Sequence, residues 1–446
     1  MRRVGQRRYL ALLGVYLVAS ANALTTIDGS PDDYLEKVRH LEPGMTLELA
    51  AGEYREGLYL HGLSGTAAAP IVIRGPANAN SAIFIAREGH NTVSIADSSY
   101  LELHNLTLDG RGLAVDAVKG EGTARWAHHI TLENLRINGH GANQQIVGIS
   151  TKCPAWNWVV RGNEIQGAGT GMYFGNSDGS APFVAGIVDG NVVTDTIGYN
   201  LQIKHQLPRP AIDGMPTTTQ VTVIRRNTFS KEHGGSSGPD ARPNVLVGHW
   251  PLAGPGQDDL YLIYGNFFYQ NPSEALFQGE GRLALYNNIF VNRLNDAIHI
   301  QPHNDQVRDV RILFNSVLTP RNGVIIRVSE TAPKPRRVLR ANAVFAEHPI
   351  VGRPTLGNVV GDYAHADLYF KRPYSSPPEL DLTPMVNVHS ASPFNSEATA
   401  DLLDIKIDFD EHPRTVPVAG AYASASSPLR RPLTLGRVPP THVPSN

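Results

Sequence analysis

The 446-residue chain has little of three things: cysteine, net charge and long hydrophobic runs. Its one cysteine, Cys153, excludes an intrachain disulfide, and we interpret it as a small buried apolar residue rather than a nucleophile. The net charge of −2 argues against a general nucleic-acid binder, because such proteins carry a large basic excess that neutralises phosphates. Any anionic ligand must therefore be met by a local group of cations.

The clearest hydrophobic run lies near the N-terminus. The chain opens with the basic segment MRRVGQRRY, continues with LALLGVYLVAS, and then has the small-x-small pattern Ala21-Asn22-Ala23. This run is well short of the roughly 20 residues that span a bilayer. We therefore predict a signal peptide at 1–23, no membrane span after its cleavage, and a secreted or periplasmic protein that acts as a monomer.

Glycine and proline are abundant, with 42 and 32 residues, and they indicate many turns and few helices. One phrase recurs along the chain: alternating apolar residues lead to Asn and then to another apolar residue, as in LELHNLTL, WVVRGNEI and YLIYGNFF. The asparagines in this position are Asn105, Asn134, Asn163, Asn191, Asn227, Asn266, Asn288, Asn315 and Asn342.

Repeats of this length indicate stacked coils. A leucine-rich repeat requires a fixed Leu ladder and a helical return, whereas a parallel β-helix requires several short β-rich strands in each coil. Val, Ile, Phe and Thr dominate these repeats and Gly interrupts them, which favours the β-helix. Asn suits a corner because it tolerates the left-handed backbone region, and stacked copies can bond side chain to side chain. We assign these asparagines to structure.

The two ends of such a stack need cover, because bare strand edges invite aggregation. PDDYLEKVRH is the best short amphipathic helix candidate and lies where an N-terminal cap is needed. We predict an all-β, single-domain solenoid with an N-terminal helical cap over 24–348. An irregular C-terminal cover over 349–424 and a disordered Pro-rich tail over 425–446 follow it.

Side chains in a strand alternate, so if Leu201 and Ile203 fill the core, Gln202 and Lys204 face solvent. We align 149–152, 172–175, 201–204, 245–248, 275–278 and 298–301 in one register. The first outward row is then Ser150, Tyr173, Gln202, Leu246, Leu276 and His299, and the second is Lys152, Gly175, Lys204, Gly248, Gln278 and Gln301.

The two longest repeats bracket these two outward rows, and insertions on one face of a solenoid commonly build a binding site. The cationic and imidazole residues in or beside these repeats are Lys204, His205, Arg209, Lys231, His233, Arg242 and His249. Amides, imidazoles and cations suit a sugar that carries a carboxylate. We therefore predict an acidic, uronate-containing polysaccharide as the partner, and as its binding residues Tyr173, Gln202, Gln278, His299, Gln301 and His303.

LEPGMTLELAAGEY, PIVIRGP, the Asn-cornered coils and DFDEHPRTVPVAGAYAS resemble secreted right-handed parallel β-helix proteins of the pectate, alginate and chondroitin lyase type. The resemblance implies right-handed coils and cleavage of a uronate chain by β-elimination. LQIKH is similar to the Lys half of the Lys–Arg pair of calcium-assisted alginate and chondroitin lyases. The next coil, NVLVGHW, has Gly248 and His249 where the Arg is expected.

Elimination across C4 and C5 of a uronate needs a base for the proton and a group that neutralises the carboxylate. Lys204 is the candidate base, because clustered cations lower a lysine pKa. His205 or His249 is the alternative base or the acid. Arg209 or Arg242 is the candidate to hold the carboxylate as a bidentate partner.

Two other functions stay open. HIQPHND, residues 299–305, resembles the signature of mannuronan C5-epimerases, with Gln301 and Asn304 in place of its two acids. A non-catalytic polysaccharide-binding protein or adhesin is the other alternative. Calcium is the candidate cofactor, and its candidate oxygen ligands are Asn176, Asp178, Glu274 and Glu280.

Overall fold

Strands dominate the protein, as the composition predicts. The computed structural model describes residues 25–77, 81–328, 336–353, 356–386, 388, 398–416, 418–425 and 430–436. The predicted signal peptide at 1–23 lies outside the described residues. Within the described ranges, none of the helices has the length and apolar character needed to cross a membrane.

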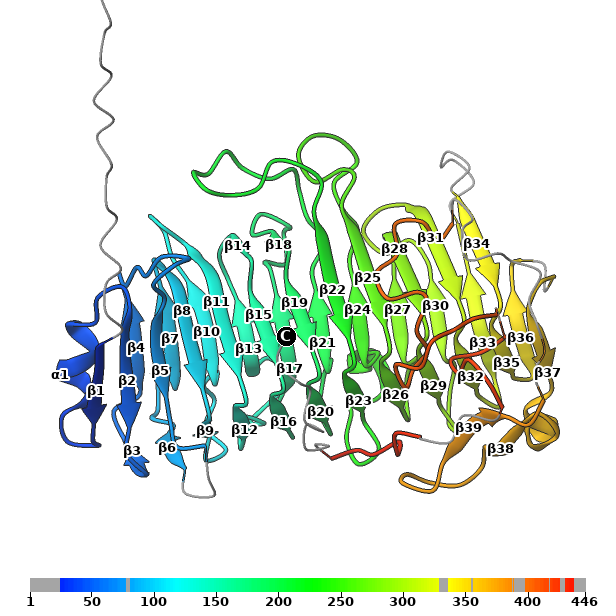
Figure 1. Ribbon diagram of the computed structural model, residues 1–446, viewed down its shortest axis with the longest axis horizontal. Helices are drawn as coiled ribbons and strands as arrows, with labels where there is room; N and C mark the ends of the chain where they lie inside the picture. Colours follow the sequence, from blue (N-terminus) through cyan, green and yellow to red (C-terminus); the bar gives the residue numbers. More distant parts are fainter. Residues whose placement is uncertain are drawn as a thin grey trace, which may run out of the picture.

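The strands form three long parallel sheets that run along the molecule (Figure 1). Successive coils add a strand to each sheet, so a strand pairs with the coil before it and the coil after it. The protein is therefore a right-handed parallel β-helix, as predicted. Its backbone hydrogen bonds are satisfied inside the stack, and free edges occur only at the two ends.

The sheets are named here A, B and C. Sheet A contains β1 (Thr25–Gly29), β2 (Met45–Leu49), β5 (Ile71–Arg74), β8 (Ser98–His104), β11 (Ala127–Glu133), β15 (Val159–Arg161), β19 (Ile187–Asp189), β22 (Val221–Arg225), β25 (Leu260–Tyr264), β28 (Gly281–Tyr286), β31 (Val307–Leu313) and β34 (Arg337–Arg340), with β14 (Ala155–Trp156) and β18 (Phe183–Val184) beside this path.

Sheet B contains β3 (Gly52–Tyr54), β6 (Ala82–Ile85), β9 (Leu106–Asp109), β12 (Arg136–Asn138), β16 (Glu164–Gln166), β20 (Val192–Thr194), β23 (Thr228–Ser230), β26 (Phe267–Tyr269), β29 (Ile289–Val291), β32 (Ser316–Leu318), β35 (Ala343–Phe345) and β37 (Val359–Gly361). Sheet C contains β4 (Leu58–His61), β7 (Val93–Ala96), β10 (Val118–Glu121), β13 (Val147–Thr151), β17 (Thr170–Phe174), β21 (Leu201–Ile203), β24 (Val245–Val247), β27 (Phe277–Gly279), β30 (Ile298–Ile300), β33 (Asn322–Ile326) and β36 (His348–Val351).

The core runs through the inside of the coils. Leu201 and Ile203 of β21 are both fully buried, which confirms the predicted inward phase of that strand. Aromatic rings stack between coils, with the rings of Phe268 and Phe290 4.3 Å apart. Cys153 also lies in this core, and burial raises the pKa of its thiol to about 12. Cys153 is therefore a buried apolar residue, as predicted.

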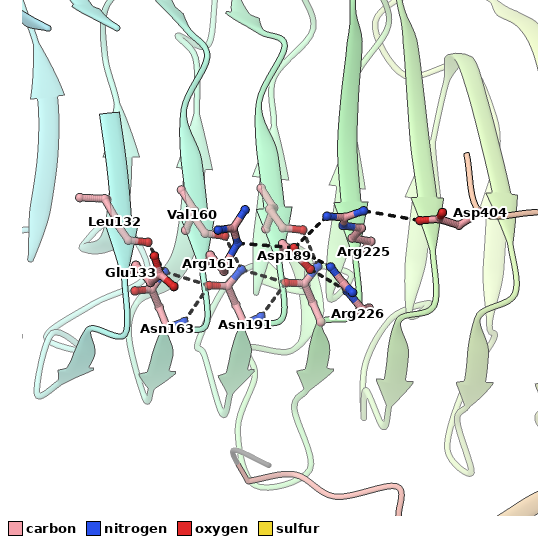
Figure 2. A network of polar contacts seen from close by, with 12 residues as sticks. Leu132, Glu133, Val160, Arg161, Asn163, Asp189, Asn191, Arg225, Arg226 and Asp404 are labelled. Atoms are coloured by element: carbon pink, nitrogen blue, oxygen red, sulfur yellow. Dashed lines mark hydrogen bonds and ion pairs between the residues drawn. The ribbon is translucent and has the colours of Figure 1, made fainter. Parts of the chain in front are cut away.

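The recurring asparagines form a ladder along the corner between sheets A and B. Asn163 Nδ2 donates to Asn191 Oδ1 at 2.9 Å (Figure 2). The same contact continues from coil to coil to Asn342, which in turn donates to Asn358 Oδ1. The left-handed backbone conformation follows a different pattern. Asn105 and Asn134 adopt it, but in the later coils the residue before the asparagine does, such as Gly162 or Arg226. The bonding between stacked side chains is thus confirmed, and the corner conformation holds for only the first two asparagines.

We expect Asn266→Ala to be among the more destabilising substitutions of a buried residue. Asn266 Oδ1 accepts from the backbone N and Nδ2 of Asn227, while its Nδ2 donates to Ile224 O at 2.9 Å and to Asn288 Oδ1. Alanine leaves these buried groups unpaired, which costs about 3 kcal/mol. Denaturant unfolding should show this loss, and the exposed Asn304→Ala should show almost none. Equal midpoints for the two variants would contradict a stabilising role for the ladder.

A row of charged side chains lies on the outer face of sheet A, beside the asparagine ladder. The Asp189 carboxylate, almost fully buried, lies 3.6 Å from Arg161, 3.1 Å from Arg225 and 2.8 Å from Arg226 (Figure 2). Arg225 also lies 3.5 Å from Asp404 of the C-terminal segment. Burial opposes ionisation of Asp189, but the arginines outweigh it and lower the pKa of this carboxyl. This row neutralises itself and joins the C-terminal segment to the coils.

The predicted N-terminal helix is present as α1 (Tyr34–Arg39), and its Tyr34 and Val38 are buried. The Tyr34 ring meets Tyr54 of β3 at 4.9 Å, edge to face. The strand β1, however, forms the free edge of sheet A at this end. A helical cap over the first coil is therefore not evident, because a helix of this length covers part of the core and leaves the edge to a strand.

The chain after β37 folds back over the last coils. It includes η2 (Tyr363–Leu368) and the antiparallel pair β38 (Phe370–Arg372) and β39 (Asp381–Pro384), while a separate short helix, η1 (Gly238–Asp240), lies earlier in the chain. Phe370 and Tyr422 pack against sheet B, and Leu402 and Ile405 pack against sheet A. The stacked strands themselves extend past residue 348 to β37. Residues 430–436 of the predicted tail pack here too, with Leu433 buried.

Candidate functional site

The candidate site lies on the outer face of sheet C. The described part of the C-terminal segment packs against sheets A and B rather than on this third sheet. The insertions between β21 and β22 and between β24 and β25 rise beside it as green loops in Figure 1. We call the outward residues of sheet C and the residues directly after its strands the sheet C strip.

The predicted register is correct for five coils and wrong for one. Pairing runs Met172 to Leu201 to Val245 as predicted, but Val245 pairs with Phe277 rather than Ala275. Leu276 is consequently buried, and Gln278 pairs with His299. The first outward row of these coils is therefore Ser150, Tyr173, Gln202, Leu246, Gln278 and His299.

The second outward row follows the strands by one residue. Extending the same pairings by one position gives Lys152, Gly175, Lys204, Gly248, Glu280, Gln301 and Arg327. Glu280 thus takes the place that the sequence alignment gave to Gln278. The row carries two lysines, one carboxylate and one arginine on a single line along the molecule.

Lys204 lies half-buried between two glycines of the neighbouring coils, Gly175 and Gly248. A Cβ on Gly175 would lie 3.3 Å from Lys204 Cβ, so glycine there leaves room for the lysine stem. Burial lowers the pKa of the Lys204 ammonium, and the charge of Glu280 opposes this shift. Among the described carboxylates, none lies within ion-pair distance of it. Lys204 is therefore a partly desolvated amine. The two glycines leave the positions on either side of it in the row without side chains.

Gly248 is fixed by close packing of the chain. A Cβ at Gly248 would lie 2.3 Å from the backbone N of His205, which is too short for any side chain. The arginine that the resemblance implies at this point has no space. A cation that assists Lys204 must come from another position of the strip.

His205 and His249 stack on each other beside Lys204, with ring centroids 5.3 Å apart. His249 Nδ1 lies 2.9 Å from Trp250 O, and because a carbonyl only accepts, Nδ1 carries the hydrogen in the neutral ring. The lone pair then lies on Nε2, which is 4.0 Å from Asp305 Oδ2. His249 is thus oriented to accept a proton, with a carboxylate near the resulting imidazolium.

His205 is the supporting ring of this pair. It packs on the turn at Gly179, where a Cβ would lie 2.9 Å from its Cδ2, and its Nδ1 is buried with no hydrogen-bond partner among the described residues. Burial, followed by the neighbouring His249 and Lys204, lowers its pKa and keeps the ring neutral. His205 therefore holds the position of His249.

Glu280 is a buried carboxylate that fastens two loops of the strip. Its Oε2 accepts from the backbone N–H groups of His303, Asn304 and Asp305 at 2.8 to 3.1 Å, and its Oε1 accepts from the backbone of His249 at 3.3 Å. HIQPHND, interpreted as an epimerase-like motif, therefore begins in β30 and continues as a loop wrapped on this carboxylate. Glu280 positions His249 and Asp305 and is already saturated with donors.

The other calcium candidates are also engaged locally. Asp178 is exposed and accepts from the backbone N and Oγ of Ser180, and Glu274 accepts from Gln278 Nε2 at 3.1 Å. Asn176 lies half-buried in the turn before Asp178. Within the described ranges, His, Cys, Asp and Glu side chains form no group of three suited to a metal ion. Calcium binding by the four candidates stays a prediction.

The two arginine candidates lie outside the sheet C strip, and the structure corrects the predicted carboxylate clamp for Arg209, while for Arg242 it stays a prediction. Arg209 is buried, forms an ion pair with the buried Asp259, and donates to Pro216 O and Thr218 O. Arg242 donates to Pro239 O and to the carbonyl of Ala241 within its own insertion. Both guanidinium groups stabilise the insertions.

Tyr173 is in the strip, but a lysine covers one face of its ring. Lys152 Nζ lies 3.5 Å from the ring centroid and Lys204 Nζ lies 6.0 Å from it. The Tyr173 hydroxyl bonds Ser177 Oγ at 2.9 Å. Stacking of a sugar on this face is therefore blocked, and the ring instead supports two cations.

The remaining predicted binding residues lie along the same face. Gln202 is covered, with 4% exposure, whereas Gln278 and His299 are half-buried. His299 Nε2 lies 2.8 Å from Asp296 Oδ2, Gln301 Oε1 accepts from Arg327, and His303 is exposed. The structure therefore keeps the polar character of the strip while pairing most of its members with neighbours.

Lys152 is the residue that the sequence-based assignment of roles omitted. It was placed in the outward row, yet no chemical role was given to it, although its position two coils from Lys204 was already visible in the alignment. Asp305 was missed because only the fold of residues 303–305 around Glu280 brings it to His249.

No family model and no curated protein matches the chain. Among solved structures, it is similar to an alginate lyase from Paenibacillus sp. str. FPU-7, with 14% identity over 76% of this chain and 98% of that one, at a TM-score of 0.42. A PL6 family alginate lyase has 13% identity over 75% and 51%, at 0.44, so the chain spans about half of it. The A-module of a mannuronan C-5 epimerase from Azotobacter vinelandii has 15% identity over 71% and 90%, at 0.40. The likeness is one of fold.

Proposed function

We propose that the protein binds an acidic, uronate-containing polysaccharide along the sheet C strip and cleaves it by β-elimination. The observation that carries the proposal is the group formed by Lys204, the oriented His249 and Asp305 on the outer face of sheet C. The structures named above include alginate lyases and a mannuronan epimerase. The N-terminal segment 1–23 supports a secreted or periplasmic location as part of the same proposal.

The proposed step uses two groups of the strip. The free amine of Lys204 takes the proton from C5 of the sugar, and the released electron pair forms the C4–C5 double bond as the C4–O bond breaks. The imidazolium of His249 then gives the Nε2 proton to the leaving oxygen. Asp305 stabilises that imidazolium before transfer, and Glu280 holds both residues through their backbones.

One observation favours a second function. Gly248 has no space for the arginine of a Lys–Arg pair, and Arg209 and Arg242 are engaged elsewhere. A strip with cations but without that arginine also suits a protein that binds a polysaccharide and does not cleave it. The test must therefore separate binding from cleavage.

We expect the purified protein to release unsaturated products from a uronate polymer. Polymannuronate, polyguluronate, polygalacturonate and chondroitin sulfate are incubated with it, and the ultraviolet absorbance of the new C4–C5 double bond is followed. Exchange of the C5 proton with solvent deuterium, without this absorbance, would instead identify an epimerase. Binding of a polymer with neither signal would identify a non-catalytic binder, and no binding to any of them would reject the proposed function.

A further inference from the structure

Two lysines approach one aromatic ring from opposite sides along the strip. Lys152 directly follows β13, Tyr173 lies in β17, and Lys204 directly follows β21. The Lys152 ammonium is 3.5 Å from the Tyr173 centroid and the Lys204 ammonium is 6.0 Å from it. The ring therefore lies beside two lysines that come from different coils.

The spacing of these lysines is set by the backbone pairing. Thr151 pairs with Phe174, and Phe174 pairs with Ile203, so the two lysines that follow lie in one row two coils apart. Two strand spacings amount to about 10 Å. The position between them is Gly175, which has no side chain to block the row. In the next coils the row changes to Gly248 and then to Glu280, which carries the opposite charge.

The spacing of about 10 Å between Lys152 and Lys204 matches the geometry of a linear polyuronate. A pyranose unit in an extended 1,4-linked chain is about as long as the spacing between coils. When each unit is turned roughly half a revolution from the one before, the carboxylates point to alternate sides. The carboxylates that face one surface then belong to every second sugar.

We propose that Lys152 and Lys204 form a two-point reader that contacts the carboxylate-bearing edges of sugar units i and i+2 of a ribbon-like uronate chain lying along the coils. The inference rests on the proposed function for its ligand class but not for its chemistry. Lys152 then binds a sugar unit that does not react, and the polysaccharide lies parallel to the stack of coils.

The charge of Lys152 supports this role at neutral pH. Burial lowers its pKa to about 8, Asp116 opposes the shift, and Lys119 and Lys204 add to it. Lys152 is thus cationic below pH 8 and loses its charge above it. Asp116 itself is occupied by the backbone N of Val147 at 2.8 Å. The contribution of Lys152 to anion binding should accordingly fall as the pH rises through 8.

The test is the dependence of affinity on chain length. Mannuronate di- and trisaccharides are titrated into the full protein by calorimetry in the cold, with chromatography confirming that they stay uncut. In the unmodified protein we expect about a tenfold gain from di- to trisaccharide, as one charge-assisted contact supplies. Lys152→Ala should abolish this gain without weakening the disaccharide, and Lys152→Arg should retain it. Lys371→Ala, an exposed lysine of β38 outside the sheet C strip, is the matched control.

Each result decides the matter. A gain that persists in Lys152→Ala, or a loss that is equal for both oligosaccharides, overturns the two-point reader even if the protein cleaves polymers. A gain that depends on Lys152 in a protein without cleavage supports the reader and rejects the lyase. If the unmodified protein binds neither oligosaccharide, the reader is rejected whatever the outcome of the polymer assay.

Discussion

Replacement of Lys204 by alanine should lower the turnover of a uronate polymer by about 10²- to 10⁴-fold, the usual contribution of a positioned acid or base. Lys204 is the desolvated amine of the strip, and alanine leaves nothing there that accepts a proton. The side chain is half-buried and belongs to the outer row, so the folded state should persist. Initial rates of double-bond formation, with circular dichroism as a check of folding, measure the effect.

The pH profile separates Lys204 from His249 as the base. A base works in its deprotonated form, so the limb of the kcat/KM profile that reports the base should rise with pH. Because burial lowers the pKa of Lys204, that rise should end below the ordinary range of a lysine. Lys371→Ala, an exposed lysine of β38, should have the profile of the unmodified protein. Full turnover by Lys204→Ala would reject Lys204 as the base and leave the imidazole of His249 as the alternative.

Replacement of Arg209 by alanine should destabilise the protein by about 3 to 5 kcal/mol, the range for breaking a buried ion pair. The substitution leaves Asp259 buried without its partner and removes the donors to Pro216 O and Thr218 O. Burial already raises the pKa of Asp259, which shows how costly its charge is in this environment. Chemical denaturation measures the loss.

Two matched variants control this experiment. Arg55→Ala removes an exposed pair with Glu53 and should change stability by less than about 1 kcal/mol. Arg209→Met combined with Asp259→Leu removes both buried charges and should recover most of the stability. If Arg209→Ala folds as stably as the unmodified protein and loses only turnover, the arginine acts in the site, as first predicted from the sequence.

The fold was predictable because its signals are local and repeated. Alternation in strands such as Leu201–Ile203 fixes which side chains face the core, and the repeated asparagine marks the same corner in the coils from Asn105 onward. Lys204 and His249 could be placed on the outer face from these signals alone. The pairing of Lys152 with Lys204 around Tyr173 followed from the same register.

The C-terminal segment illustrates what local signals do not carry. Its residues show no period, so neither the contact of Asp404 with Arg225 nor the burial of Leu433 on the coils follows from the sequence. These contacts depend on where an irregular chain closes on a finished solenoid. Among the described residues, the packing of this segment falls on sheets A and B.

The sequence by itself determined the coil, its inward and outward phase and the presence of cations on one strip. Tertiary structure decided which coil positions meet. A shift of two residues preserves alternation, so the hydrophobic pattern accepts Ala275 or Phe277 opposite Val245 equally, and only the pairing of strands brings Glu280 into the row. Arg209 likewise meets Asp259 across two insertions whose course no periodic pattern records. The hydrophobic period determines on which face of the coil a side chain lies, whereas packing and loop closure determine which residues it contacts.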